Sequence, residues 1–127
     1  MKSHTIDEYV YRLHDYAASG DEPIIARPFY VGEDLVAVLV TMQPGARVSD
    51  HLHEHHDEIF DVISGSGIFM LDGEAIAFGP GMTIVVPAGV RHGLLAGAEP
   101  WVLRETVHRH VYARKAIKRA LNKRLRR

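Results

Sequence analysis

From Pro23 onward the chain is a succession of short apolar stretches, rich in β-branched and aromatic residues, separated by turn residues. Stretches of this length without helical spacing predict β-strands. We expect strands at residues 24–30, 35–42, 58–64, 67–71, 74–78, 82–86, 93–96 and 101–107. Asp72-Gly73 lies between two of them and predicts a tight hairpin. In a chain of 127 residues this pattern predicts one all-β domain, a sandwich or a barrel.

The two ends of the chain are expected to be helical. Thr5-Ile-Asp-Glu8 has the form of a capping box, and the apolar spacing after it predicts one amphipathic helix over residues 6–18. Near the other end an apolar stripe runs among mostly basic residues: Ala113, Ala116, Ile117, Ala120, Leu121 and Leu125. We therefore divide the chain into an N-terminal helical segment (1–22), a barrel (23–110) and a basic C-terminal helix (111–127) that packs on the barrel or on a partner subunit.

The net charge of −1 conceals an asymmetry along the chain. Residues 113–127 hold eight Lys or Arg and no acid, which leaves seven basic and 16 acidic residues in the remainder. A basic tail of this kind can bind nucleic acid or an anionic membrane surface. We favour packing of its apolar stripe on the acidic body, because that body would repel polyanions. Nucleic acid is therefore not an expected partner.

The composition also bears on the compartment and on the chemistry. Cysteine is absent, which excludes disulfides, thiolate metal ligands and a cysteine nucleophile. The first 22 residues show no apolar segment of the kind found in secretion signals. The longest apolar run, Leu35 to Val40, is too short to span a membrane. We therefore expect a cytoplasmic protein without a membrane span.

The segment HLHEHHDE at residues 51–58 holds four of the nine histidines. On a strand that enters a turn, His51 and His53 point to the same side because they are two residues apart. Glu58, at the start of the next strand, and His92, on a later one, can approach the same point, and imidazole with carboxylate suits a divalent transition metal. The alternative is an inert, solvated histidine loop. Spacing alone does not separate the two.

The wider pattern favours the metal site. Gly45-x5-His51-x-His53-x4-Glu58-x6-Gly65 resembles the first motif of the cupin superfamily, and Gly81-x5-Pro87-x-Gly89-x2-His92 resembles the second. The resemblance departs at Ala96, where the motif has Asn. It implies a double-stranded β-helix, or jelly-roll barrel, between the two terminal helices. It also implies that one divalent ion (Zn, Fe, Mn, Ni or Co) is held by His51, His53, Glu58 and His92.

Strand alternation predicts a mostly apolar lining around such an ion. If Glu58 faces inward, Phe60 and Val62 do too, with either Ile68 and Met70 or Phe69 and Leu71, and with Ile84 and Val86. Arg47, Arg91 and Arg104 can bind a substrate anion or lie on the surface as ordinary arginines. His55 and His56 are surplus to the ligand set. They are either solvated or partners of the ligands, or His56 is a proton shuttle. The pattern selects no general base.

Three kinds of function fit these features. The first is a metal-dependent enzyme acting on a small oxygenated metabolite, of dioxygenase, isomerase, epimerase or lyase type. The second is a binding module for a small molecule without catalysis. The third is a scaffold with a structural metal. Because a short barrel has exposed edge strands, which the stretch 24–30 or the terminal helices can cover, we also expect a homodimer.

Overall fold

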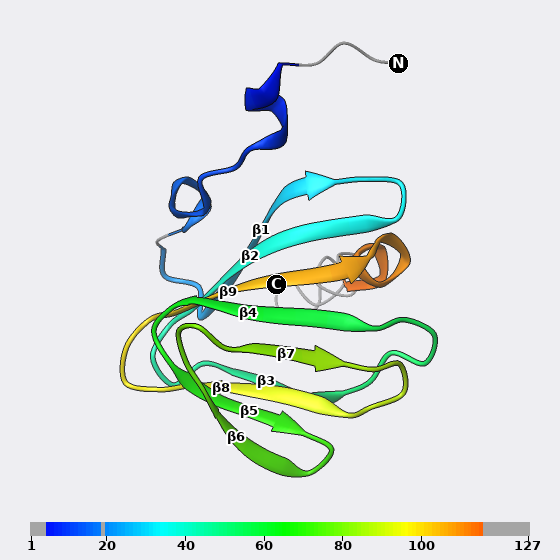
Figure 1. Cartoon of the computed structure of the whole chain (residues 1–127). Helices are drawn as coiled ribbons and strands as arrows, with labels where there is room; N and C mark the ends of the chain where they lie inside the picture. Colours follow the sequence, from blue (N-terminus) through cyan, green and yellow to red (C-terminus); the bar gives the residue numbers. More distant parts are fainter. Residues whose placement is uncertain (1–4, 19, 116–127) are drawn as a thin grey trace, which may run out of the picture.

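The computed structural model describes residues 5–18 and 20–115 (Figure 1). Nine strands within these residues carry the fold, and all eight predicted strands are confirmed to within one residue at each end. The strands are β1 (Ile24–Val31), β2 (Leu35–Met42), β3 (Arg47–His51), β4 (Glu58–Ser64), β5 (Gly67–Leu71), β6 (Glu74–Phe78), β7 (Thr83–Val86), β8 (His92–Ala96) and β9 (Trp101–His108). The additional strand, β3, is polar and carries the first histidine of the segment HLHEHHDE.

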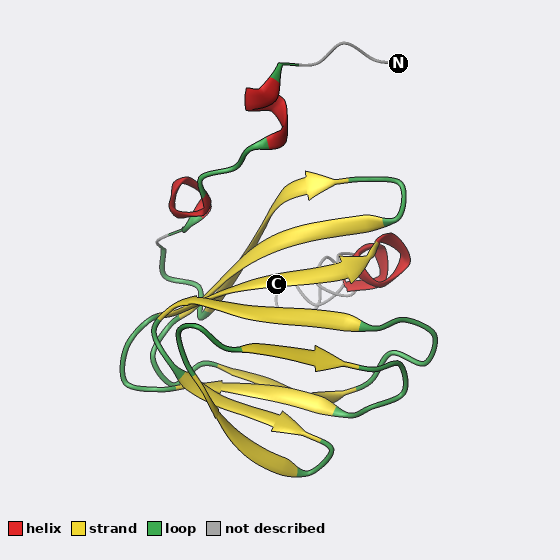
Figure 2. Cartoon of the chain, in the orientation of Figure 1, coloured by secondary structure: helices red, strands yellow, loops and turns green. Residues whose placement is uncertain are grey.

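The strands form two antiparallel sheets that face each other (Figures 1 and 2). One sheet has the order β1-β2-β9-β4-β7 and the other β3-β8-β5-β6. Sequential strands therefore alternate between the sheets over much of the chain, as in a jelly roll. The predicted all-β barrel is confirmed.

The hairpin between β5 and β6 turns where the sequence predicts. Leu71 pairs with Glu74, and the two residues between them both have positive φ, 50° at Asp72 and 82° at Gly73. Two successive residues in the left-handed backbone conformation form a turn whose twist matches the right-handed twist of the flanking strands. Asp and Gly are among the few residues that adopt this conformation at low cost.

The main core lies between the two sheets and is built by strand alternation. Phe60 on β4 and Phe69 on β5 meet edge to face, with ring centroids 5.1 Å apart. Trp101 and Leu103 on β9 are fully buried beside them. The inward-facing residues of β4, β7 and β9 thus alternate with more exposed ones, as Asp61 and Val85 illustrate on β4 and β7.

A second, smaller core lies under the C-terminal helix, whose described part covers residues 109–115. Val111 from the helix packs with Val36, Val38 and Val107 from β2 and β9. Figure 2 shows this helix directly after β9, at the end of the barrel. The apolar stripe was predicted to begin at Ala113, but Ala113 is exposed and Val111 is the buried residue. The other predicted members of the stripe lie beyond residue 115, outside the described residues.

The single amphipathic helix predicted over residues 6–18 is wrong. Two short 3₁₀ helices, η1 (Ile6–Tyr9) and η2 (Leu13–Tyr16), occupy this segment, and Val10 between them is extended. The Thr5 side chain makes no capping hydrogen bond, and Ile6 is 74% exposed. An isolated turn of helix is unstable without tertiary packing, and here Val10 is exposed as well, while Tyr16 contacts Phe29 of β1. Along the described part of the chain, no helix has the length and hydropathy of a membrane span.

Candidate metal centre

Three histidines predicted as ligands converge inside the barrel. His51 ends β3 and lies opposite His92, the first residue of β8, while His53 follows in the loop after β3. The ring centroids of His51 and His92 are 4.3 Å apart, and those of His53 and His92 are 5.7 Å apart. One ring nitrogen from each of the three lies within 4.8 Å of the others. The structure thus brings together residues that the two sequence motifs predicted.

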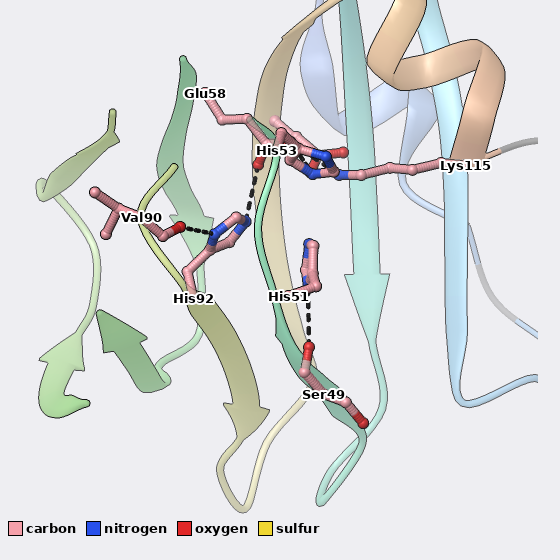
Figure 3. A network of polar contacts seen from close by, with 8 residues as sticks. Ser49, His51, His53, Glu58, Val90, His92 and Lys115 are labelled. Atoms are coloured by element: carbon pink, nitrogen blue, oxygen red, sulfur yellow. Dashed lines mark hydrogen bonds and ion pairs between the residues drawn. The ribbon is translucent and has the colours of Figure 1, made fainter. Parts of the chain in front are cut away.

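Glu58 supplies a carboxylate to the same point from the opposite sheet (Figure 3). It begins β4 and is 1% exposed. Its Oε1 lies 2.9 Å from His53 Nε2, and its Oε2 lies 3.2 Å from His92 Nε2. All four predicted ligands therefore surround one location.

Backbone carbonyls orient two of the rings. His51 Nδ1 lies 2.8 Å from the carbonyl oxygen of Ser49, and His92 Nδ1 lies 3.1 Å from that of Val90. Each carbonyl accepts a hydrogen bond from Nδ1–H, which leaves Nε2 as the nitrogen that faces the centre. A hydrogen bond of this type on the far ring nitrogen is what fixes the orientation of metal-binding histidines.

Burial and charge keep the site in the protonation states that a cation requires. Burial lowers the pKa of His53 to about 4 against the opposing charge of Glu58, and burial also lowers the pKa of His51. Burial alone would raise the pKa of Glu58. The hydrogen bond from His92 and the charge of Lys115 outweigh that effect and hold the pKa of Glu58 at about 2. Near neutral pH the neutral imidazoles of His51 and His53 therefore lie beside an ionised Glu58 carboxylate.

The polar contacts of this group fit a bound metal ion. Among the described residues nothing forms a hydrogen bond with the buried His53 Nε2, although Glu58 Oε1 lies close to it. His92 Nε2 reaches Glu58 Oε2 as a donor only if the ring carries two protons, because Nδ1 already donates to Val90. A divalent cation in place of that proton would bind both nitrogens and the carboxylate. Three imidazoles and one carboxylate suit zinc and the neighbouring transition metals.

Two charged residues of the site were not predicted from the sequence. Lys115, on the C-terminal helix, places its Nζ 2.6 Å from Glu105 Oε2 and 3.2 Å from Glu58 Oε1. The carboxylates raise the pKa of Lys115 against the opposing effect of its burial, so the ammonium stays charged. The signal for Glu105 was present, because it occupies the same buried face of β9 as Trp101, Leu103 and Val107. The inward direction of Lys115 depends on how the helix docks, which no local pattern encodes.

The wall around the centre is aromatic and aliphatic. The His92 ring is nearly parallel to that of Phe69 at a centroid distance of 6.1 Å, and Phe60 lies at 6.0 Å from His92. Val62, Ile84 and Val86 are buried as the alternation predicts, and on β5 the fully buried residue is Phe69. The predicted apolar lining is therefore confirmed, with Phe69 in place of Ile68 and Met70.

The remaining polar candidates lie elsewhere. His55 is exposed, and His56 is stacked on His108 outside the ligand set. Arg104 forms two hydrogen bonds with Asp61 on the outer face of the sheet, and Arg47 and Arg91 are exposed. None of the three arginines is among the residues that contact the ligands, so the ordinary surface role holds for them.

Comparison with known proteins gives one family and a set of similar structures. The family described as Cupin domain matches residues 38–103, and no curated protein matches the chain. The protein TT1209 from Thermus thermophilus is 25% identical over 78% of this chain and 95% of its own, with a TM-score of 0.73. KdgF from Halomonas sp. is 28% identical over 72% of this chain and 84% of its own, with a TM-score of 0.66.

A third similar structure shows the fold alone. The RmlC-like cupin from Shewanella frigidimarina is 23% identical over 68% of this chain and 76% of its own, with a TM-score of 0.63. The match of the family covers both ligand-bearing motifs, from the strand before His51 to the strand after His92.

Proposed function

The chain belongs to the cupin family, and on this premise we propose that it is a small metal-dependent enzyme acting on an oxygenated metabolite. One divalent transition ion is held by His51, His53, Glu58 and His92. The observation that carries the proposal is the convergence of three ring nitrogens, two of which contact a buried carboxylate, with His53 Nε2 lacking a hydrogen bond among the described residues.

The residues around the ion have distinct roles in this proposal. When bound, the ion would act as a Lewis acid toward a substrate oxygen or would activate dioxygen. Ser49 and Val90 hold the rings of His51 and His92 in place through their carbonyls. Phe60 and Phe69 exclude water from that side of the site, which strengthens the electrostatic interactions inside it.

Lys115 and Glu105 define the substrate class. The ammonium of Lys115 lies beside the ligand Glu58 and stays charged. It is therefore placed to pair with a negative oxygen of a substrate that chelates the ion. A small hydroxy acid, keto acid or sugar acid presents both a chelating oxygen and such a charge. Glu105 positions the ammonium through its 2.6 Å contact.

The ligand set is tested by metal content. Replacing His51, His53 or His92 by Ala, or Glu58 by Gln, should each reduce the tightly bound metal at least tenfold, because each change removes one of four donors. His55→Ala is the matched control, since this neighbouring side chain is 73% exposed and its ion pair is with Glu54 in its own loop. Equal losses in the control and in the ligand variants would refute the assignment.

Turnover is tested on the metal-loaded protein. We expect consumption of dioxygen, or conversion detected by mass spectrometry, with a member of a panel of small diols, keto acids and sugar acids. The activity should disappear on chelation and return with one added metal. A metal-loaded protein that binds members of the panel without converting any of them would instead support a binding module.

That second function is favoured by the position of the C-terminal helix. Lys115 covers the centre and occupies hydrogen-bonding positions on both carboxylates. Two surface hollows of the described residues, of about 570 and 290 Å³, are lined by other residues: the first around the β1–β2 turn and the second on the outer face of β3, β5 and β8. A centre whose two carboxylates already pair with an ammonium suits a site that retains a ligand without converting it.

We also propose that the protein is a homodimer. β1 is an edge strand of the five-stranded sheet, and Tyr30 and Val31 at its end are exposed. Pairing of this edge with a second copy would satisfy its free backbone groups. Sedimentation should give a mass twice the 14.2 kDa of one chain, and a monomer at micromolar concentration would refute the proposal. The cytoplasmic location and the absence of nucleic-acid binding also stay predictions.

A further inference from the structure

A second group of histidines gathers where the C-terminal helix begins. His56 comes from the loop between β3 and β4, His108 ends β9, and His110 lies in the first turn of the helix. One ring nitrogen from each lies within 4.8 Å of the others. The rings of His56 and His108 are stacked with centroids 4.0 Å apart, and the ring of His110 is 4.7 Å from that of His108.

Apart from the contacts between the rings themselves, few polar interactions of the described residues account for three imidazoles lying so close. Among the described residues, the one hydrogen bond recorded for these rings is that from the backbone N–H of His110 to His108 Nδ1, at 3.1 Å. No ion pair joins them to a carboxylate of the described chain, whereas the adjacent His55 lies 3.8 Å from Glu54.

We propose that His56, His108 and His110 form a second binding site for a divalent transition metal, of which zinc is the representative. Three imidazole nitrogens with an exchangeable water in the fourth position form a common coordination set for zinc. His108 Nδ1 accepts a hydrogen bond, so the nitrogen of this ring that remains for a metal is Nε2, which carries the ring proton. Metal binding at Nε2 transfers the ring proton to Nδ1 and breaks that hydrogen bond. The second site is therefore weaker than the centre that includes Glu58.

The position of the second site gives it a structural consequence. His56 lies in the same loop as His53 and two residues before Glu58, and His110 lies in the same helix as Lys115. An ion bound to all three histidines would tie this loop to this helix. It would thereby restrict both segments that contribute side chains to the metal centre.

The test is a zinc titration of untagged, metal-stripped protein. Calorimetry measures the binding steps, and zinc analysis after gel filtration measures the number of ions that the protein retains. The full chain should bind about two zinc ions in a tight and a weaker step. His110→Asn and His108→Asn should each remove the weaker step only. The double variant His51→Asn and His53→Asn should lose the tight step and keep the weaker one. His55→Asn, the matched control in the same loop, should keep both steps.

The variants separate this proposal from that of the metal centre. His110 is exposed, so its replacement by Asn should leave the melting temperature and the circular dichroism of the metal-free protein unchanged. A second zinc ion that persists in both His108→Asn and His110→Asn would overturn the second site. A full chain that binds a single zinc ion, lost in the His51 and His53 double variant, would overturn it as well. A protein that lacks the tight step but keeps the weaker step still supports the second site.

Discussion

The Nζ atom of Lys115 lies 3.2 Å from Oε1 of Glu58, the oxygen that faces His53 Nε2 at 2.9 Å. A cationic side chain from the end of the described chain thus reaches a carboxylate that we assign to a metal ion. Glu105 holds the same ammonium at 2.6 Å. In the metal-free protein, Lys115 therefore supplies positive charge that a bound ion would supply in the loaded protein.

The first prediction concerns this competition. Lys115→Met should raise the affinity for zinc roughly tenfold, because it removes a positive charge next to the ion. The same change should lower the stability of the metal-free protein, because two buried carboxylates lose their cation. Arg114→Met is the control, since Arg114 is the adjacent, exposed cation on the same helix. Calorimetry and thermal unfolding measure the two effects. Weaker zinc binding in Lys115→Met would mean that the ammonium positions Glu58 for the ion.

The second prediction concerns pH. His53 has a pKa of about 4 in the folded protein and about 6.5 in the unfolded chain, so the unfolded state binds more protons between these values. The contribution of His53 to stability is thus complete above about pH 6.5 and is lost as the pH falls toward 4. In the metal-free protein, His53→Gln should therefore show a shallower decline of melting temperature over this interval. Parallel curves for the two proteins would contradict the depressed pKa.

The third prediction concerns Gly93, the residue after His92. A Cβ at this position would lie 2.9 Å from the carbonyl oxygen of Val48 and would also clash with the Asp50 side chain. Because β3 pairs with β8 here, Gly93→Ala should push β3 away and displace His51 from His92. We expect a loss of about 1–3 kcal/mol in the free energy of unfolding and a clear loss of bound metal. Gly79→Ala is the control, since its Cβ would meet nothing closer than 3.7 Å.

The fourth prediction concerns the smaller core. Val111 is 1% exposed and packs on Val36, Val38 and Val107. Val111→Ala removes two buried methyl groups and should lower the free energy of unfolding by about 2 kcal/mol. Thermal unfolding should show a melting temperature roughly 5–10 °C lower. Ala113→Ser, at an exposed position of the same helix, should leave it within about 1–2 °C. An unchanged melting temperature for Val111→Ala would show that the helix does not pack as described.

Most of the barrel was predictable because its strands are apolar and are bounded by Gly, Pro and Asp. β3 was the exception, since Arg47, Ser49 and Asp50 give it no apolar run, and only the spacing of His51 and His53 indicated it. The N-terminal segment shows the reverse error. Ile6, Tyr9 and Val10 have helical spacing, yet the side chains of all three are more than half exposed. Periodicity predicts a helix only where tertiary structure offers a partner.

The candidate site likewise contains residues that the sequence predicted and residues that it did not. His51, His53, Glu58 and His92 were identified through motif spacing, and the structure places all four around one point. Lys115 escaped prediction because its approach depends on the docking of Val111 into the smaller core. The triad of His56, His108 and His110 joins segments about fifty residues apart, a proximity that follows from strand order alone.

The metal centre draws its donors from both halves of the barrel. His51 and His92 face each other in register on β3 and β8, whereas Glu58 comes from β4 in the opposite sheet. A slip of one residue between β3 and β8 would turn His51 to the outer surface. Only a chain that has closed its two sheets in the native register can assemble all four donors. The fraction of molecules that retain metal after gel filtration is consequently an assay of correct folding. Metal binding also favours the native register of β3 and β8 over registers shifted by one residue.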